Sequence, residues 1–397
     1  MLVRTGGDSA LRSFLVALFC SSAALCVAAS SLRAQRSRTH SVPAANTIIF
    51  RGTVVRQDST TPAQYSSVEL VEAHARHLSD DAGHFSFKVP AGRYHVLVRQ
   101  LGFAARDTVV DISERAPPPV LLVVMTAVTI KLSDVTVRAP QTCTVPGVDS
   151  SAVPVLGEFM ADVRQNADRE LLLRRAYPFE YTVEDVQTTT PSAWPDSALS
   201  VVDTLGYRSD ALMPYTRGNT VFTDRTDPRG AWERMRLPST LDFADSTFLA
   251  THCFDYGVAA SGNYDINFRP LATITAPDVE GTVTLDSLTF VVRSAVVRLT
   301  NAGAVAPGYG HLEVKTTYRE VLPRIALPDQ ISSTQRYTTP APDSRSFVAT
   351  EVQSMRALRF IGLAPAGVNR EQTFAVPAGT GGGLSSGLHL SNAVPMR

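Results

Sequence analysis

Two short segments with alternating apolar residues most constrain the fold of this chain. In segments 85–89 and 94–98 the apolar residues fall on every second position, and Pro90-Ala91-Gly92 separates the two segments. Since every second side chain of a β-strand points to the same face, each segment predicts a strand with one buried face. The tight connection predicts that the two strands pair as an antiparallel hairpin.

The same kind of pattern fills the stretch 46–139. Short runs of β-branched and aromatic residues are broken about every eight to twelve residues by Gly, Asp and Pro, which is typical of a β-sandwich. The turn Asp80-Asp81-Ala82-Gly83 places glycine where a positive φ is needed. Segment 109–112 predicts a further strand, and segment 120–125 predicts a buried one.

These residues resemble the carboxypeptidase regulatory-like domain, a prealbumin-type β-sandwich. The resemblance rests on the order Gly52, Ala63 to Leu70, Asp81-Ala82-Gly83-x-Phe85, Pro90-x-Gly92-x-Tyr94 and Leu101-Gly102-Phe103. Similar modules precede many TonB-dependent receptors of bacterial outer membranes, and Leu132 to Ala139 looks like the segment that follows the module there. The chain after residue 139 is short for such a receptor. The resemblance therefore implies a non-catalytic β-domain.

The first 34 residues predict a secretory signal peptide. Arg4 and Arg12 precede the apolar run 14–29, and cleavage is expected after Ala29 or Ala34. The alternative is a retained membrane anchor, although the run is shorter than the ~20 residues that span a bilayer. We expect export to the periplasm or to an outer-membrane-associated location, with no membrane-spanning segment after signal removal.

Two cysteines remain after removal of the signal peptide. Cys143 and Cys253 form an even pair in an exported chain, which predicts one disulfide between them. Such a bridge joins the end of the first domain to the middle of the second. The alternative is two unpaired, buried thiols.

From residue 150 the apolar residues adopt a helical period. Those spaced by three or four form one stripe: Leu156, Phe159, Met160, Val163, Ala167 and Leu171. Arg164, Asp168 and Arg169 are expected on other faces, with Ser151 as the N-cap and Pro178 beyond the end. We expect this helix to pack on its own domain, and the alternative is a helix that binds a partner.

The chain beyond Pro178 returns to alternating β-segments, while the irregular stretch 191–248 predicts long loops that cross a sheet. Glu280-Gly-Thr-Val-Thr-Leu-Asp286 resembles the antiparallel strands of periplasmic lipoprotein-carrier half-barrels. We therefore expect a mainly β protein. Its expected parts are a signal peptide over 1–34, a prealbumin-like β-sandwich over 46–139, an antiparallel β-sheet domain with one amphipathic helix over 150–360, and a disordered tail over 364–397.

No catalytic, cofactor or metal site is predicted. The chain has no His-Glu-x-x-His, and none of its histidines has Glu three residues later, so a zinc peptidase is not indicated. The acids and imidazoles at 74–84 are expected to be solvated turn residues, with a metal site as the alternative. Gly383-Leu-Ser385-Ser-Gly387 matches a nucleophile elbow only by letter, because it lies in the predicted tail.

The function class expected is binding. Thirty-seven acidic residues balance 37 basic ones, so no positive field favours nucleic acid. We expect a non-enzymatic binding or scaffold protein of the bacterial cell envelope, whose partner is an envelope protein, a glycan or an amphiphile. One alternative is a periplasmic carrier that holds a lipid or other amphiphile in a concave sheet.

Two sets of residues are candidates for sites. Five aromatic residues are expected either to line a groove for a ligand or to plug the sheet edges: Trp194, Tyr207, Tyr215, Phe222 and Trp232. The second alternative function is a hydrolase with an unrecognised site, whose candidate residues are His252, Asp255, His311 and Glu313.

Overall fold

The computed structural model describes residues 47–58, 60–115, 120–128, 142–147, 154–224, 232–305, 309–339, 342, 344–374, 389–391 and 393–395. The predicted signal peptide and Ser385 lie outside these residues. Within them the chain is mainly β, as predicted, with several antiparallel sheets and two α-helices.

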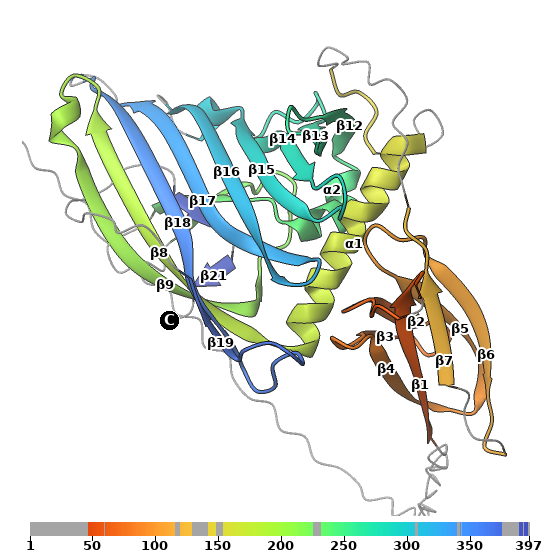
Figure 1. Ribbon diagram of the computed structural model, residues 1–397. Coiled ribbons are helices and arrows are strands. Elements are labelled where there is room, and N and C mark those ends of the chain that lie inside the picture. The colour runs from red at the N-terminus through yellow and green to blue at the C-terminus, as the bar shows by residue number, and fades with distance from the viewer. Residues whose placement is uncertain are drawn as a thin grey trace, which may run out of the picture. The chain divides into compact units, whose positions relative to one another are not determined.

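The first domain is a sandwich of two sheets (Figure 1). One sheet has the order β4-β1-β7 and comprises β1 (Thr47–Arg56), β4 (His84–Pro90) and β7 (Val120–Met125). The other has the order β3-β2-β5-β6 and comprises β2 (Ser67–Leu70), β3 (Ala75–Leu78), β5 (Gly92–Arg99) and β6 (Arg106–Ile112). The inner faces meet in one apolar core. The strand β7 is not fully buried, because Val120 and Leu122 on its outer face are exposed.

The predicted hairpin between segments 85–89 and 94–98 is wrong in its pairing. Both segments are strands with the predicted buried faces, but β4 pairs with β1, whereas β5 pairs with β2 and β6. The connection Pro90-Ala91-Gly92 therefore passes from one sheet to the other. Apolar alternation reports which face of a strand is buried, and both faces here meet the same core.

Two glycines of the sandwich occupy places that a larger residue cannot. Gly83 has a φ of 78°, as the turn required, and a Cβ there would lie 2.3 Å from the carbonyl oxygen of Val54. In β1, a Cβ on Gly52 would lie 2.3 Å from the Phe85 ring. The aromatic side chain of β4 thus fills the space that Gly52 leaves open.

The second domain is built on an 11-stranded sheet, which Figure 1 shows as a strongly curved row. The strand order is β12-β13-β14-β15-β16-β17-β18-β8-β9-β21, and β19 pairs with β18. The strands are β8 (Phe179–Pro191), β9 (Leu199–Leu212), β12 (His252–Val258), β13 (Tyr264–Pro270), β14 (Asp278–Leu285), β15 (Val292–Thr300), β16 (Tyr309–Leu322), β17 (Ile325–Thr338), β18 (Ser346–Phe360), β19 (Glu371–Thr373) and β21 (Ala393–Pro395).

Short elements complete this domain. A separate three-stranded sheet contains β10 (Val221–Asp224), β11 (Trp232–Arg236) and β20 (His389–Ser391). The short helices are η1 (Pro195–Ser197), η2 (Thr240–Ala244), α2 (Ser246–Leu249) and η3 (Ala302–Ala304). The carboxylate of Asp245 caps α2 by accepting the backbone N–H groups of Thr247 and Phe248 at 2.8 and 3.0 Å.

Two sequence expectations for this domain need correction. The stretch 191–248 was expected to consist of loops, but it contains β9, which pairs with β8 along most of its length. Its apolar period is obscured because Asp203 and Ser209 share the face of Tyr207. The disordered tail predicted over 364–397 is wrong for its described residues, since β19, β20 and β21 pair with β18, β11 and β9, and Phe374 packs against the adjacent core.

The long helix α1 runs from Pro154 to Ala176. Proline suits its first position, where the missing N–H would be unpaired in any case. The predicted apolar stripe is buried from Leu156 to Ala167, but Leu173 is buried where Leu171 was expected. Arg169, expected on an outer face, is fully buried. The reason is that its guanidinium meets backbone carbonyl groups that need donors.

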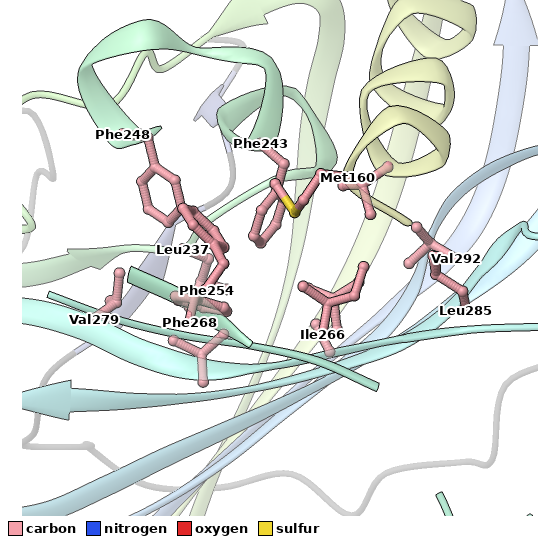
Figure 2. Close-up of a cluster of buried hydrophobic side chains, with 14 of the residues drawn as sticks. Met160, Leu237, Phe243, Phe248, Phe254, Ile266, Phe268, Val279, Leu285 and Val292 are labelled. Carbon is pink, nitrogen blue, oxygen red and sulfur yellow. The ribbon is translucent and has the colours of Figure 1, made fainter. Parts of the chain in front are cut away.

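The helix and the short elements near residue 245 cover one face of the sheet. Figure 2 shows Met160 of α1 with Phe243 and Phe248 above apolar side chains of the strands. Phe243 and Phe268 form an edge-on pair with ring centroids 5.4 Å apart. This core fixes the helix and the η2–α2 segment against the sheet, and so fixes the walls of the cavity described below.

Two arginines connect the sandwich to the second domain through backbone carbonyl groups. Arg169 donates from Nη1 to the oxygen of Tyr65 at 2.5 Å, from Nε to Arg324 at 3.2 Å and from Nη2 to Pro323 at 3.2 Å. Arg324 in turn donates to the oxygen of Leu101. Burial, assisted by the charge of Arg324, lowers the pKa of Arg169 to about 9.

A half-buried carboxyl group on α1 predicts a pH dependence of stability. Burial, with a smaller effect from Glu158, raises the pKa of Asp162 from 3.8 to about 7. The stability that the neutral form confers is complete below pH 3.8 and is lost as the pH rises through about 7. We expect Asp162→Asn to stabilise the protein by about 1–2 kcal/mol at pH 8 and by little at pH 4, measured by urea unfolding. Asp196→Asn, at an exposed position of η1, is the control, and equal effects at both pH values would contradict the assignment.

No helix among the described residues combines the length and the apolar character needed to cross a membrane.

Candidate functional site

A cavity of about 200 Å³ lies between the C-terminal half of α1, the segment 212–245 and one face of the sheet. Four neighbouring strands, β16, β17, β18 and β8, contribute side chains to it. Most of its wall is apolar, including Val183, Leu237, Leu327, Ile331 and Met355. Described residues from the helix, the segment 212–245 and the sheet enclose it on several sides.

One end of the cavity carries an ion pair on α1. Glu170 and Arg174 lie one helical turn apart, and Arg174 Nη2 donates to Glu170 Oε1 at 2.6 Å. Arg174 Nη1 also donates to the oxygen of Ser209 at 3.0 Å, and the hydroxyl of Thr240 donates to the second oxygen of Glu170. Both charged side chains are nearly enclosed. The pair is therefore fixed by hydrogen bonds from three different elements.

A second ion pair holds the segment opposite the sheet. Arg236 Nη2 donates to Asp242 Oδ1 at 2.5 Å, and Arg236 Nε donates to the oxygen of Met213 at 2.8 Å. The other oxygen of Asp242 accepts the backbone N–H of Ser239 at 2.7 Å. Burial raises the pKa of Asp242, although the nearby guanidinium opposes this shift. These bonds fold the chain 236–242 into the cavity wall.

Two tyrosines of the cavity wall have unused hydroxyl groups. Tyr181 of β8 and Tyr318 of β16 line the cavity, and neither hydroxyl has a hydrogen-bonding partner among the described residues. Burial raises the pKa of Tyr181 to about 12, and burial together with the charges of Glu170 and Asp242 raises that of Tyr318. Both tyrosines thus line the same cavity as Glu170.

Beyond the cavity the same face of the sheet becomes polar. Asp185 and Gln187 on β8 lie opposite Gln353 and Glu351 on β18. Gln187 donates to Asp185 at 2.8 Å, and Gln353 donates to Glu351 at 2.7 Å. All four side chains are buried. The cavity therefore lies where the apolar part of this face meets a polar part.

A buried network lies behind Tyr215, which also lines the cavity. The Tyr215 hydroxyl donates to Asp278 Oδ2 at 2.8 Å, and Asp278 Oδ1 lies 3.7 Å from His252 Nε2. His252 and Asp278 are both fully enclosed. Burial lowers the pKa of His252, although the Asp278 charge opposes this shift. The pair belongs to the core and does not face an open cleft.

The structure separates the five predicted aromatic residues. Tyr215 lines the cavity, and the ring of Tyr207 stacks 5.2 Å from Tyr181, which lines it. Trp194 is 61% exposed at the connection between β8 and β9. Phe222 lies on β10, and Trp232 begins β11. Among those of the five whose side chains the structure describes, Tyr215 is the one that lines the cavity.

The hydrolase candidates are not brought together either. Asp255 accepts hydrogen bonds from Asn267 and Arg269 at 2.6 Å each, whereas His252 faces Asp278. His311 Nε2 lies 3.9 Å from Glu313, beyond hydrogen-bonding distance. Among the described residues, no three His, Cys, Asp or Glu side chains are placed to hold a metal ion.

Cys143 and Cys253 form a disulfide in the structure. The segment around Cys143 runs beside β12: the backbone N–H of Gly147 donates to the oxygen of His252, and that of Ala272 donates to the oxygen of Cys143. The bridge therefore fastens the segment 142–147 to β12, the edge strand of the 11-stranded sheet.

Comparisons with known proteins add little. No family model matches the sequence, and no curated protein matches it. A crystal structure from Bacteroides fragilis, provisionally described as a membrane-associated protein of unknown function, is 10% identical and has a TM-score of 0.18, with 78% of this chain and 98% of that chain covered. Another from Bacteroides vulgatus, provisionally described as a pore-forming toxin, is 9% identical and has a TM-score of 0.13, with 81% and 96% covered. Neither superposition is close enough to carry an argument about this chain.

Proposed function

We propose that this protein is a non-enzymatic binding protein of the bacterial cell envelope and that its ligand occupies the cavity of the second domain. The observation that carries the proposal is the cavity itself, which combines an apolar wall with a few fixed polar groups. This combination is typical of small-molecule sites.

The size of the cavity limits the ligand. An apolar cavity of about 150 Å³ in another protein binds benzene, so about 200 Å³ holds one ring with a short substituent. A lipid with two acyl chains is much larger. Of the carrier functions considered above, only transport of a small amphiphile therefore suits the cavity without a large opening of the sheet.

The proposed location in the envelope rests on three features. The N-terminal sequence has the order of a secretory signal, the sandwich sequence resembles an envelope-associated module, and the disulfide between Cys143 and Cys253 suits an oxidising compartment. In this proposal the sandwich is a non-catalytic module.

Binding of a ring-sized probe tests the proposal directly. We expect toluene to shift the ¹³C-methyl NMR signals of Met213 and Met355, which line the cavity, and to leave the signal of Met125 in the sandwich core unchanged. Val183→Trp fills the cavity from β8 and is expected to abolish these shifts.

Val258→Trp serves as the matched control, because it adds the same bulk at an exposed position of β12. Circular dichroism establishes that both variants are folded. The proposal fails if toluene leaves Met355 unaffected in the wild-type protein, or if the two tryptophan variants respond alike.

A further inference from the structure

We propose that the cavity takes a small, uncharged ring compound that carries an oxygen acceptor, such as an alcohol, a phenol or a carbonyl compound. This inference rests on the proposed binding function and assigns the chemical class of its ligand. It follows from the charged groups of the cavity wall, each of which already has a partner, and from its hydrogen-bonding groups, of which some are unused.

The charges show why the ligand is uncharged. Arg174 is paired with Glu170, and Arg236 is paired with Asp242, each at hydrogen-bonding distance and nearly enclosed. The two other carboxylates of the wall also have partners, since Asp329 is paired with Arg319 and Asp245 accepts two backbone N–H groups of α2. A charge added to this cavity has no counterion left, and burying an unpaired charge is costly. A carboxylate ligand also meets Glu170 and Asp242, and an ammonium ligand also meets the two guanidinium groups. Both kinds of ion are therefore disfavoured against a neutral compound.

The unused polar groups show why the ligand bears an acceptor. The hydroxyls of Tyr181 and Tyr318 have no partner among the described residues, and Nη1 of Arg236 makes no hydrogen bond to any of them. A tyrosine hydroxyl donates or accepts, whereas a guanidinium only donates. An oxygen acceptor on the ligand can accept a hydrogen bond from any of these groups, whereas an apolar ligand leaves all of them unpaired.

Four probes with the same carbon skeleton test this assignment: toluene, benzyl alcohol, benzoate and benzylammonium. Their affinities are measured at neutral pH from the Met355 methyl signal. We expect benzyl alcohol to bind about fivefold to tenfold more tightly than toluene, because it adds a hydrogen bond inside the cavity. We expect benzoate and benzylammonium to bind at least about tenfold more weakly than benzyl alcohol.

The double variant Tyr181→Phe/Tyr318→Phe identifies the groups responsible. It is expected to bring the affinity for benzyl alcohol close to that for toluene while leaving toluene binding unchanged. Tyr256→Phe removes a tyrosine hydroxyl that does not line the cavity, so it is expected to preserve the preference for the alcohol.

The outcomes separate the inference from the proposed function. If benzoate or benzylammonium binds most tightly, if toluene equals benzyl alcohol, or if the double variant keeps the preference, the ligand class is wrong and the binding function stands. If none of the four probes shifts the Met355 signal, the binding function itself is wrong.

Discussion

Replacing Arg169 by methionine is expected to lower the free energy of unfolding by about 3–5 kcal/mol. Methionine retains the apolar stem but removes the donors to the carbonyl oxygens of Tyr65, Pro323 and Arg324, which are 2.5, 3.2 and 3.2 Å from the guanidinium. Each buried carbonyl left without a donor costs about 1–3 kcal/mol, partly offset because a buried charge is removed. Urea unfolding followed by far-UV circular dichroism measures the change.

Arg175→Met is the matched control, since Arg175 is exposed on the same helix, and we expect it to change the stability by less than about 0.5 kcal/mol. Arg169→Lys is expected to recover only part of the loss, because one ammonium cannot reproduce the three directions of the guanidinium. A loss of less than about 1 kcal/mol for Arg169→Met would show that the three carbonyl groups find other donors.

Arg169 also illustrates what apolar periodicity predicts and what it omits. The stripe from Leu156 to Ala167 located the helix and its packed face correctly. The same periodicity assigned Arg169 to an outer face, because a local pattern contains no information on carbonyl groups contributed by Tyr65 and Pro323. Those groups lie far away in the sequence, and only the tertiary structure brings them to the helix.

The prediction of strand pairing from the sequence was limited in the same way. Alternation identified the buried faces of β4 and β5, and the turn residues located their ends, including Gly83 with its positive φ. It did not identify their partners, because consecutive strands of a sandwich bury their inner faces in one core whether they pair with each other or not.

The candidate site was the least predictable part. Glu170 and Arg174 have the spacing of an ordinary surface ion pair on a helix, and Tyr181 and Tyr318 look like alternating strand residues. Only the order of β8, β18, β17 and β16 in the sheet places these side chains around one cavity. Of the aromatic residues singled out in the irregular stretch whose side chains the structure describes, Tyr215 is the one that lines it.

Replacing both Cys143 and Cys253 by serine is expected to destabilise the protein strongly. The bridge spans a sequence separation of 110 residues. Without the bridge the unfolded chain gains conformational entropy. For a loop of that length the chain-entropy account gives a decrease of about 4–5 kcal/mol in the free energy of unfolding. The contacts of Gly147 and Ala272 beside β12 remain possible without the bridge, so the edge of the sheet is expected to loosen before the core unfolds.

Reductant provides the matched comparison for this prediction. Wild-type protein with reductant is expected to unfold at the urea concentration of the double serine variant, and the variant is expected not to respond to reductant. Peptide mass mapping establishes that the two cysteines of the exported protein are joined. An unchanged unfolding midpoint under reduction would mean that the strand contacts alone hold the segment 142–147 on β12. Unlinked cysteines in the peptide map would mean that the disulfide no longer supports an oxidising compartment.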